Sequence, residues 1–257
     1  MPIITLTTDW NNEDYYIGAV KGTIYSECDH VNIVDITHQI RPFNIFQAAF
    51  ILKNSYKFYP QETIHIIGIK TEMQPNQPYL AAKCNGHYFL GTDNGIFSLL
   101  FKDDEKPEFF ALKDFAPSSF PVLDVFSKIV GKIINGASID TLGTKTEEIN
   151  RRVPLRATIE EKVISGSIVY IDSFQNAITN VSKDLFERVV KDKPFKIYVQ
   201  SNHYMISKIN QSYHETSVGE ILALFNSLNL LEIAINGGNA AELLNLDINS
   251  SIRIKFQ

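Results

Sequence analysis

Apolar and polar residues follow two rhythms along the first half of the chain. Short runs of apolar and β-branched residues predict buried strands, and stretches with apolar residues every three or four positions predict helices. The strand-like runs are 3–7, 31–36 and 63–70, and the helical stretches are 15–24, 45–54 and 123–135. Strands that alternate with helices are typical of a mainly parallel sheet covered by helices.

Turn and capping residues mark the ends of several of these elements. Asp14 and Asn44 each precede a helical stretch, so each is predicted to cap a helix N-terminus. Asn85 and Gly86 separate two apolar runs, which predicts a β-hairpin at this point.

The pattern changes after a charged, threonine-rich stretch at 139–152, which is predicted to be a linker. Short strands with close turns and little helix follow at 162–172, 195–200, 217–225, 231–235 and 251–256. Such runs are typical of a small β-barrel or sandwich. The predicted fold class is therefore α/β, with two domains. Residues 1–155 form an α/β sandwich with a mainly parallel sheet, and residues 156–257 form an all-β, barrel-like domain.

Composition narrows the classes of function. The 257 residues carry a net charge of -5 without a long basic run, so nothing favours nucleic acid as a partner. No apolar run approaches the roughly 18 residues of a membrane span, and the first residues lack the basic segment of a signal peptide. The two cysteines and six histidines show no metal-ligand spacing. We expect a cytoplasmic protein with no metal and no membrane partner.

Polar residues follow the predicted strands. Asp9 comes directly after the first strand, at the sheet edge where open α/β folds bind ligands. A carboxylate there suits the two hydroxyls of a ribose, although Asp9 also fits a plain turn. No glycine-rich phosphate loop follows this strand, and no nucleophile elbow occurs. His38 and His65 lie in or beside buried strands and are predicted to be structural.

Five blocks, in order and at compatible spacing, cover nearly the whole chain. They are TTDWNNEDYYIGAVKG at 7–22, IVDITHQIRPFNIFQAAFIL at 33–52, GTDNGIFSLL at 91–100, IDSFQNAITN at 171–180 and NSLNLLEIAINGGNAAELL at 226–244. Together they resemble the S-adenosylmethionine (SAM) hydroxide adenosyltransferase family, which is related to the fluorinases and chlorinases. The resemblance implies a homotrimer that binds SAM or adenosine between the N-domain of one subunit and the C-domain of its neighbour.

The resemblance also implies roles for individual residues. Asp9 would hold the ribose hydroxyls, and Phe43 would present an aromatic ring to the nucleoside. Asp172 and Asn176 would hold the amino-acid end, and Tyr213 would stack against the adenine. The adenine edge would be read by Asn226, Ser227, Asn236 and Gly237.

The catalytic positions of the family are altered here. Family members that use hydroxide carry an aspartate, an arginine and a histidine that are thought to activate water, and the corresponding residues here are Lys70, Gln77 and Pro121. Proline takes no proton, and an ordinary lysine is protonated at neutral pH. The halogen-using relatives carry a tyrosine at the Lys70 position, so their pattern is absent as well. Glu72 is a candidate substitute base, or else the partner of Lys70 in a salt bridge.

Three interpretations of function remain open at this point. The first is a SAM- or adenosine-binding homologue whose catalytic groups are lost or rebuilt. The second is an active enzyme that cleaves SAM to adenosine and methionine, or to a halogenated adenosine, by substitution at C5'. The third is a non-catalytic assembly protein with a vestigial pocket.

Overall fold

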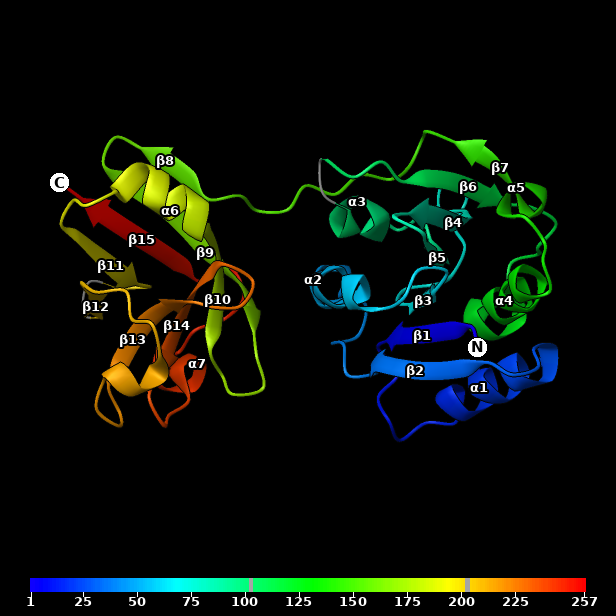
Figure 1. The fold of residues 1–257 in the computed structure, drawn as a ribbon, viewed down its shortest axis with the longest axis horizontal. Helices are drawn as coiled ribbons and strands as arrows, with labels where there is room; N and C mark the ends of the chain where they lie inside the picture. The colour runs from blue at the N-terminus through cyan, green and yellow to red at the C-terminus, as the bar shows by residue number, and fades with distance from the viewer. Residues whose placement is uncertain (102–103, 202–203) are drawn as a thin grey trace. The chain divides into compact units, whose positions relative to one another are not determined.

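The computed structural model describes residues 1–101, 104–201 and 204–257. The chain divides into two compact units, Met1–Pro154 and Leu155–Gln257 (Figure 1). Each unit has its own sheet and its own hydrophobic core, so each is described by itself.

The first unit is built on a seven-stranded sheet in the order β2-β1-β3-β5-β4-β6-β7. Its strands are β1 (Ile3–Thr8), β2 (Asn32–Thr37), β3 (Ile64–Gly68), β4 (Tyr79–Cys84), β5 (His87–Thr92), β6 (Glu108–Leu112) and β7 (Gly143–Thr146). The strands β2, β1, β3 and β5 are parallel neighbours, and β4, β6 and β7 add antiparallel pairs. The α/β class with parallel strands in its N-terminal part is confirmed, and so is the hairpin between β4 and β5.

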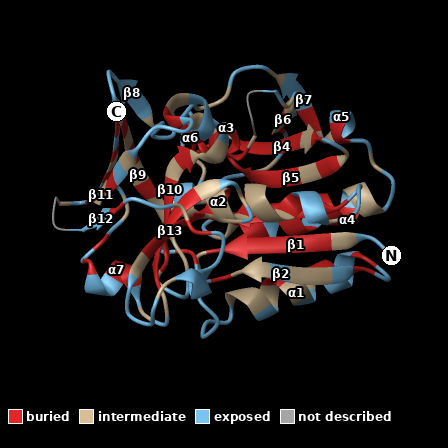
Figure 2. Cartoon of the chain, turned by 60° about the vertical axis from the view of Figure 1, so that its left-hand side comes forward, coloured by how far each residue is buried: buried red, intermediate tan, exposed pale blue. Residues whose placement is uncertain are grey.

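Helices cover both faces of this sheet (Figure 1). On one face, α1 (Tyr16–Glu27), a π-helical turn at Val122–Phe126 and α4 (Ser127–Ile134) pack against Ile4 and Leu6 of β1. On the other face, α2 (Ile45–Ser55), extended by a 3-10 turn at Tyr56–Phe58, and α3 (Ile96–Leu100) pack against Ile67 and Phe89. The strands are therefore buried on both sides, and β1 and β5 are coloured almost wholly as buried in Figure 2. This burial explains their nearly unbroken apolar runs.

Three predictions about this unit have clear outcomes. Asn44 caps α2, where its Oδ1 accepts from Gln47 N at 3.0 Å. Asp14 does not cap α1, which begins at Tyr16 with no side-chain cap. The linker predicted at 139–152 is wrong in its first part, which forms α5 (Ile139–Leu142) and β7. The strand β7 forms because its backbone pairs with the edge of β6, a tertiary contact that a local pattern does not reveal.

His65 lies at the centre of a buried polar chain in this unit. Its Nδ1 contacts Thr5 Oγ1 at 2.7 Å, and its Nε2 contacts His87 Nδ1 at 3.2 Å. Burial, and then the neighbouring His87, lower the pKa of His65 to about 3. The neutral imidazole is thus the folded form, which confirms the structural role predicted for this residue.

The second unit is an antiparallel sheet in the order β12-β11-β15-β9-β10-β14-β13, with β8 beside β9. Its strands are β8 (Thr158–Glu160), β9 (Val163–Ile171), β10 (Ala177–Ser182), β11 (Phe195–Val199), β12 (Met205–Ile206), β13 (Ile221–Phe225), β14 (Leu230–Ile235) and β15 (Ser251–Phe256). A bridge between Asn210 and Leu224 links the segment after β12 to β13 at the opposite end of the order. The sheet is therefore nearly closed, and the barrel-like prediction is confirmed.

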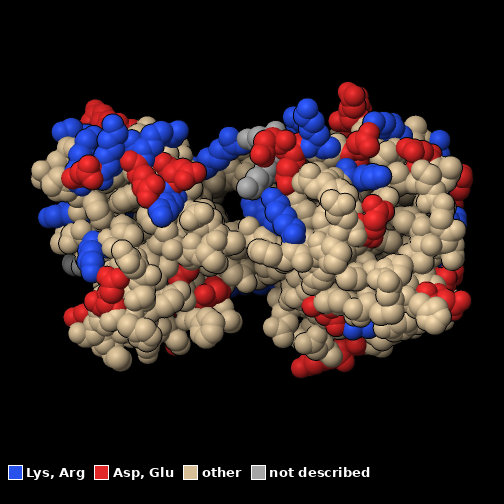
Figure 3. Space-filling model, in the orientation of Figure 1, with Lys and Arg blue, Asp and Glu red and all other residues tan. Residues whose placement is uncertain are grey.

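Short helices complete the second unit: α6 (Lys183–Val190), α7 (Ala240–Leu243) and a 3-10 turn, η3 (Tyr213–Glu215). The sequence analysis missed α6, although Ser182 caps it by accepting from Leu185 N at 3.2 Å. Its buried residues Phe186 and Val190 join the barrel core, so packing stabilises a helix of only two turns. In Figure 3, lysine and arginine side chains gather near α6 and β8, with acidic side chains among them.

Candidate functional site

The carboxyl ends of the parallel strands in the first unit form one edge of the sheet, and the candidate residues of this unit follow them. Asp9 comes after β1, His38 after β2, Lys70 after β3 and Asp93 after β5. Because the strands are parallel neighbours, their following loops share one edge of the sheet. This is the edge at which open α/β sheets bind ligands.

Asp9 and Phe43 are brought together by a direct hydrogen bond. Asp9 Oδ2 accepts from Phe43 N at 2.7 Å. Burial raises the pKa of Asp9, and the backbone hydrogen bonds from Phe43 and from its own N–H oppose that rise. Phe43 has a φ of 64° and is 71% exposed. A bulky residue in this conformation is strained, and the bond to Asp9 helps to hold it there.

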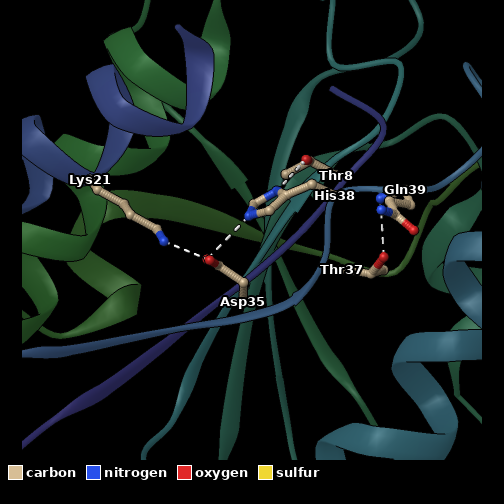
Figure 4. Close-up of polar contacts among 6 residues, drawn as sticks. All are labelled: Thr8, Lys21, Asp35, Thr37, His38 and Gln39. Carbon is tan, nitrogen blue, oxygen red and sulfur yellow. Dashed lines mark hydrogen bonds and ion pairs between the residues drawn. The ribbon is translucent and has the colours of Figure 1, made fainter. Parts of the chain in front are cut away.

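A buried histidine ties the loop after β1 to the loop after β2 (Figure 4). His38 Nδ1 lies 2.8 Å from Thr8 Oγ1, and His38 Nε2 lies 3.1 Å from Asp35 Oδ1. Lys21 Nζ reaches Asp35 Oδ2 at 2.6 Å, which places a cation at the outer end of this chain of contacts. The indole of Trp10 stacks over His38 with ring centroids 6.4 Å apart. Asp9 is therefore flanked by two residues that His38 holds in place.

The loops after β3 and β5 are joined through backbone carbonyls. Asn94 Nδ2 donates to the carbonyls of Ile69 at 2.9 Å and Lys70 at 3.1 Å. Lys70 is exposed and has a φ of 47°. Glu72 is also exposed, and within the described residues it forms no ion pair with Lys70. The salt bridge considered between these two residues is therefore not formed.

Asp93 is a buried carboxyl that the sequence analysis included in the block at 91–100 without giving it a role. It is 3% exposed, and its Oδ2 accepts from Asn150 N at 2.8 Å and from Asn150 Nδ2 at 3.1 Å. Burial raises its pKa, and the bonds from Asn150 oppose the rise. Its Oδ1 is buried without a partner in the described part of the chain. The signal that marked this residue was the block GTDNG.

The other two altered catalytic positions, Pro121 and Gln77, take part in the local structure of a helical turn and a loop turn. Pro121 directly precedes the π-helical turn at Val122–Phe126, a place where its missing N–H costs nothing. Its neighbour Phe120 packs edge-on against Trp10 at 5.3 Å. Gln77 closes a turn by donating its N–H to Gln74 O at 2.9 Å, and its Oε1 is buried without a partner in the described chain.

In the second unit, Asp172 and Asn176 bracket the turn between β9 and β10. Asp172 Oδ1 accepts from the backbone N–H groups of Phe174 at 2.9 Å and Asn176 at 2.8 Å. Asp172 Oδ2 accepts from Asn176 Nδ2 at 3.1 Å. The structure therefore brings these two predicted residues together, and Asp172 Oδ2 keeps lone pairs for a further donor.

Tyr213 and Asn226 meet through a residue that the sequence analysis missed. Glu232 in β14 is 3% exposed, and it accepts from Tyr213 Oη at 2.7 Å and from Asn226 Nδ2 at 3.1 Å. Burial and the bond to Glu232 raise the pKa of Tyr213, and the charge of Asp172 adds to the rise. The only sequence signal for Glu232 is a charged residue inside an otherwise apolar strand, LLEIAI.

The remaining candidates lie in turns near these residues. Asn236 Nδ2 donates to Thr216 O at 2.7 Å, and Gly237 has a φ of 67°. A Cβ on Gly237 would lie 3.2 Å from Val218 Cγ1, so both conformation and space favour glycine there. Ser227 is exposed in the turn between β13 and β14.

The described residues hold no group of three or more histidine, cysteine, aspartate or glutamate side chains placed to bind a metal ion. No helix in the described ranges is long and apolar enough to cross a membrane.

Comparisons with known proteins agree on one family. The model of the SAM hydroxide adenosyltransferase N-terminal domain matches residues 4–143, and that of the C-terminal domain matches residues 166–253. An (R)-S-adenosyl-L-methionine hydrolase of Methanocaldococcus jannaschii is 29% identical over 281 residues, which cover 100% of this chain and 97% of that protein. A fluorinase of Actinopolyspora mzabensis is 21% identical, covering 98% of this chain and 97% of its own.

A solved structure shows the same fold along the whole chain. A conserved protein of Thermotoga maritima superposes with a TM-score of 0.87 at 22% sequence identity, covering 99% of this chain and 100% of its own. With both family models matched in order, the chain belongs to the SAM hydroxide adenosyltransferase family.

Proposed function

We propose that this protein binds an adenosine-type nucleoside, either SAM or adenosine, and that its catalytic groups have been lost or rebuilt. The observation that carries the proposal is Asp9. It stands at the carboxyl edge of the parallel sheet with Oδ2 bonded to Phe43 N. A carboxylate has about four acceptor positions, so Asp9 retains enough of them for the two hydroxyls of a ribose.

The second unit supplies groups of the kind that the rest of such a ligand needs. Tyr213 is 40% exposed as a residue, and an aromatic ring at such a position suits stacking on a purine. Asp172 keeps acceptor capacity on Oδ2, which suits the ammonium of the amino-acid end of SAM. These residues lie in turns at the ends of barrel strands, where side chains are free to meet a ligand.

Most of the hydrogen-bonding groups of the Asn226 side chain are already used within the protein, so few remain for a base. Its Oδ1 accepts from Leu228 N at 3.0 Å and Leu230 N at 3.2 Å, and its Nδ2 donates to Glu232. Only one N–H of the amide remains for a ligand. The contribution of Asn226 is therefore a single donor, and the neighbouring backbone supplies the other contacts to the base.

The altered positions favour adenosine over SAM. Two unit charges 4 Å apart at an effective dielectric of about 20 repel by roughly 4 kcal/mol, and screening at an exposed site reduces this. Lys70 is exposed and in the described chain has no carboxylate partner, so its charge opposes the sulfonium of SAM. Adenosine carries no such charge and is not opposed. We propose further that the protein is a homotrimer, which sedimentation velocity would test.

An active SAM hydrolase is the second candidate, because a full-length relative at 29% identity bears that name. In this protein, water would attack C5', the carbon–sulfur bond would break with its electrons on methionine, and a base would accept the proton of water. Glu72 is the candidate base because it is exposed in the loop after β3. Glu72→Gln would then abolish turnover and leave binding intact.

Two measurements separate these candidates. Calorimetric titration with adenosine and with SAM tests binding, and the proposal fails if neither ligand produces binding heat. Liquid chromatography of SAM incubated with the protein, with and without chloride, tests turnover against an Asp9→Ala control. Adenosine and methionine above the control would establish the hydrolase, and a chlorinated product would establish halide use. Intact SAM together with adenosine binding would support the binding protein.

A further inference from the structure

A buried carboxylate lies behind the candidate ligand residues of the second unit. Glu232 occupies the middle of β14, paired with Ile178 of β10 on one side and Leu224 of β13 on the other. Its neighbours Leu231 and Ile233 point into the barrel core. Because side chains alternate along a strand, Glu232 points to the opposite face, where Leu222, Leu224 and Ala234 form a small apolar cluster.

The hydrogen-bond partners of Glu232 are neutral. Tyr213 Oη donates at 2.7 Å and Asn226 Nδ2 donates at 3.1 Å. None of the ion pairs formed by the described residues includes Glu232. Burying a carboxylate without a cation costs folding free energy, and an apolar residue of similar size would suit the strand better. A contribution to folding stability therefore does not explain why a glutamate occupies this position.

The two donors come from separate segments on either side of β13. Tyr213 belongs to η3, which precedes β13, and Asn226 opens the turn between β13 and β14. The η3 segment has a second tie to β14, because Asn236 Nδ2 donates to Thr216 O at 2.7 Å. Tyr213 as a residue is 40% exposed between these two ties. Its hydroxyl is anchored while part of the ring remains open.

We propose that Glu232 is a positioning residue, which fixes the ring of Tyr213 and the amide of Asn226 in the arrangement that receives a purine base. The inference rests on the proposed nucleoside-binding function and assigns to that site a residue that does not itself touch the ligand. A ring that is held by its hydroxyl is already ordered before the base stacks on it. The entropy cost of binding falls accordingly.

A double-mutant cycle on adenosine affinity tests this coupling in the full-length protein. The variants are Glu232→Met, which removes both acceptor oxygens, Tyr213→Phe and the two together, measured by calorimetric titration. Each single change removes the bond that holds the Tyr213 hydroxyl, so each is expected to weaken binding roughly three- to tenfold. The double variant is expected to bind no more weakly than the weaker single variant, because that bond is lost only once. Glu242→Met is the matched control, since Glu242 is an exposed glutamate on α7.

The outcomes are distinguishable. Wild-type affinity in Glu232→Met, or additive losses in the double variant, would overturn the positioning role and leave the proposed function standing. A lower unfolding temperature with unchanged affinity would make Glu232 a structural residue only. If Glu232→Met fails to fold, wild-type affinity in Tyr213→Phe overturns the inference by itself. If the wild-type protein binds no adenosine, the proposed function fails first and the inference fails with it.

Discussion

The two units hold their candidate residues in different ways. In the first unit, Asp9 is held by a backbone N–H, and the loops around it are tied by a buried imidazole, His38. In the second unit, Tyr213 and Asn226 are held by a buried carboxylate, Glu232, and Asn226 also builds its own turn.

This difference decides how much of each side chain remains for a ligand. Asp9 gives up acceptor positions to the N–H of Phe43 and to its own N–H, whereas Asn226 gives up its carbonyl and half of its amide donors. A residue at a parallel strand end is supported by the loops beside it. A residue in a hairpin turn has to satisfy the turn first. If both residues contact the proposed nucleoside, Asp9 should therefore contribute more to its affinity than Asn226 does.

The largest expected effect is the loss of folding stability at low pH, and it should occur in the first unit. The folded-state pKa of His65 is about 3, below its unfolded value of 6.5, so the folded state binds fewer protons. This contribution to stability is complete above pH 6.5 and is lost as the pH falls towards 3, by roughly 5 kcal/mol in total. Trp10 is the single tryptophan, so its fluorescence should report acid unfolding of this unit.

Variants identify the group responsible for the acid effect. His65→Gln should flatten the pH dependence of the unfolding free energy between pH 6 and 4 relative to the wild type. His30→Gln is the control, because His30 is exposed in the same unit. An equal pH dependence in all three proteins would show that His65 does not control the acid response.

The next largest effect is expected at Asp9. Asp9→Ala removes a charged hydrogen-bond acceptor from the proposed ribose site and should weaken adenosine binding roughly 10- to 100-fold in a calorimetric titration. Asp9→Asn keeps an acceptor for Phe43 N and should fall between Asp9→Ala and the wild type. Asp14→Ala is the control, since Asp14 is exposed and caps no helix. Wild-type affinity in Asp9→Ala would remove the basis for the proposed ribose contact.

A smaller and selective effect is expected at Asp172. Asp172→Asn preserves an oxygen that can accept from the backbone of Phe174 and Asn176, so the turn should survive. The lost charge should weaken SAM binding about tenfold and leave adenosine binding unchanged, because only SAM carries an ammonium. Equal losses for the two ligands would mean that Asp172 acts on the turn and does not contact the amino-acid end.

The smallest effect is expected at Lys70. Lys70→Gln removes an exposed positive charge and should strengthen SAM binding a few-fold, with adenosine unaffected. The gain should shrink as salt rises, because the Debye length falls from about 10 Å at 0.1 M to about 3 Å at 1 M. A gain that does not change with salt would argue against charge repulsion as its cause.

Local sequence patterns were sufficient to predict the elements that have long apolar runs or strong capping residues. The run at 3–7 predicted β1, and Asn44 predicted the start of α2. Asp14 failed as a cap because the chain stays irregular until Tyr15, so its side chain does not reach a helix end. The strands β6 and β10 were missed, and each pairs with a segment distant in the chain, β6 with β4 and β10 with β14. Such pairing stabilises stretches whose own preference is weak.

The sequence by itself determined the class of the fold, because strand periods are local signals, and its ordered blocks identified the family. The ligand contacts that the resemblance implies for Asp9, Asp172 and Tyr213 stay predictions. The tertiary structure alone decided which of these groups are still available to a ligand. Asn226 is largely occupied, and Glu232 matters because Tyr213 and Asn226, which lie 19 and 6 residues before it in the chain, both donate to it. A hydrogen bond depends on distance and direction in space, and spacing along the chain specifies neither.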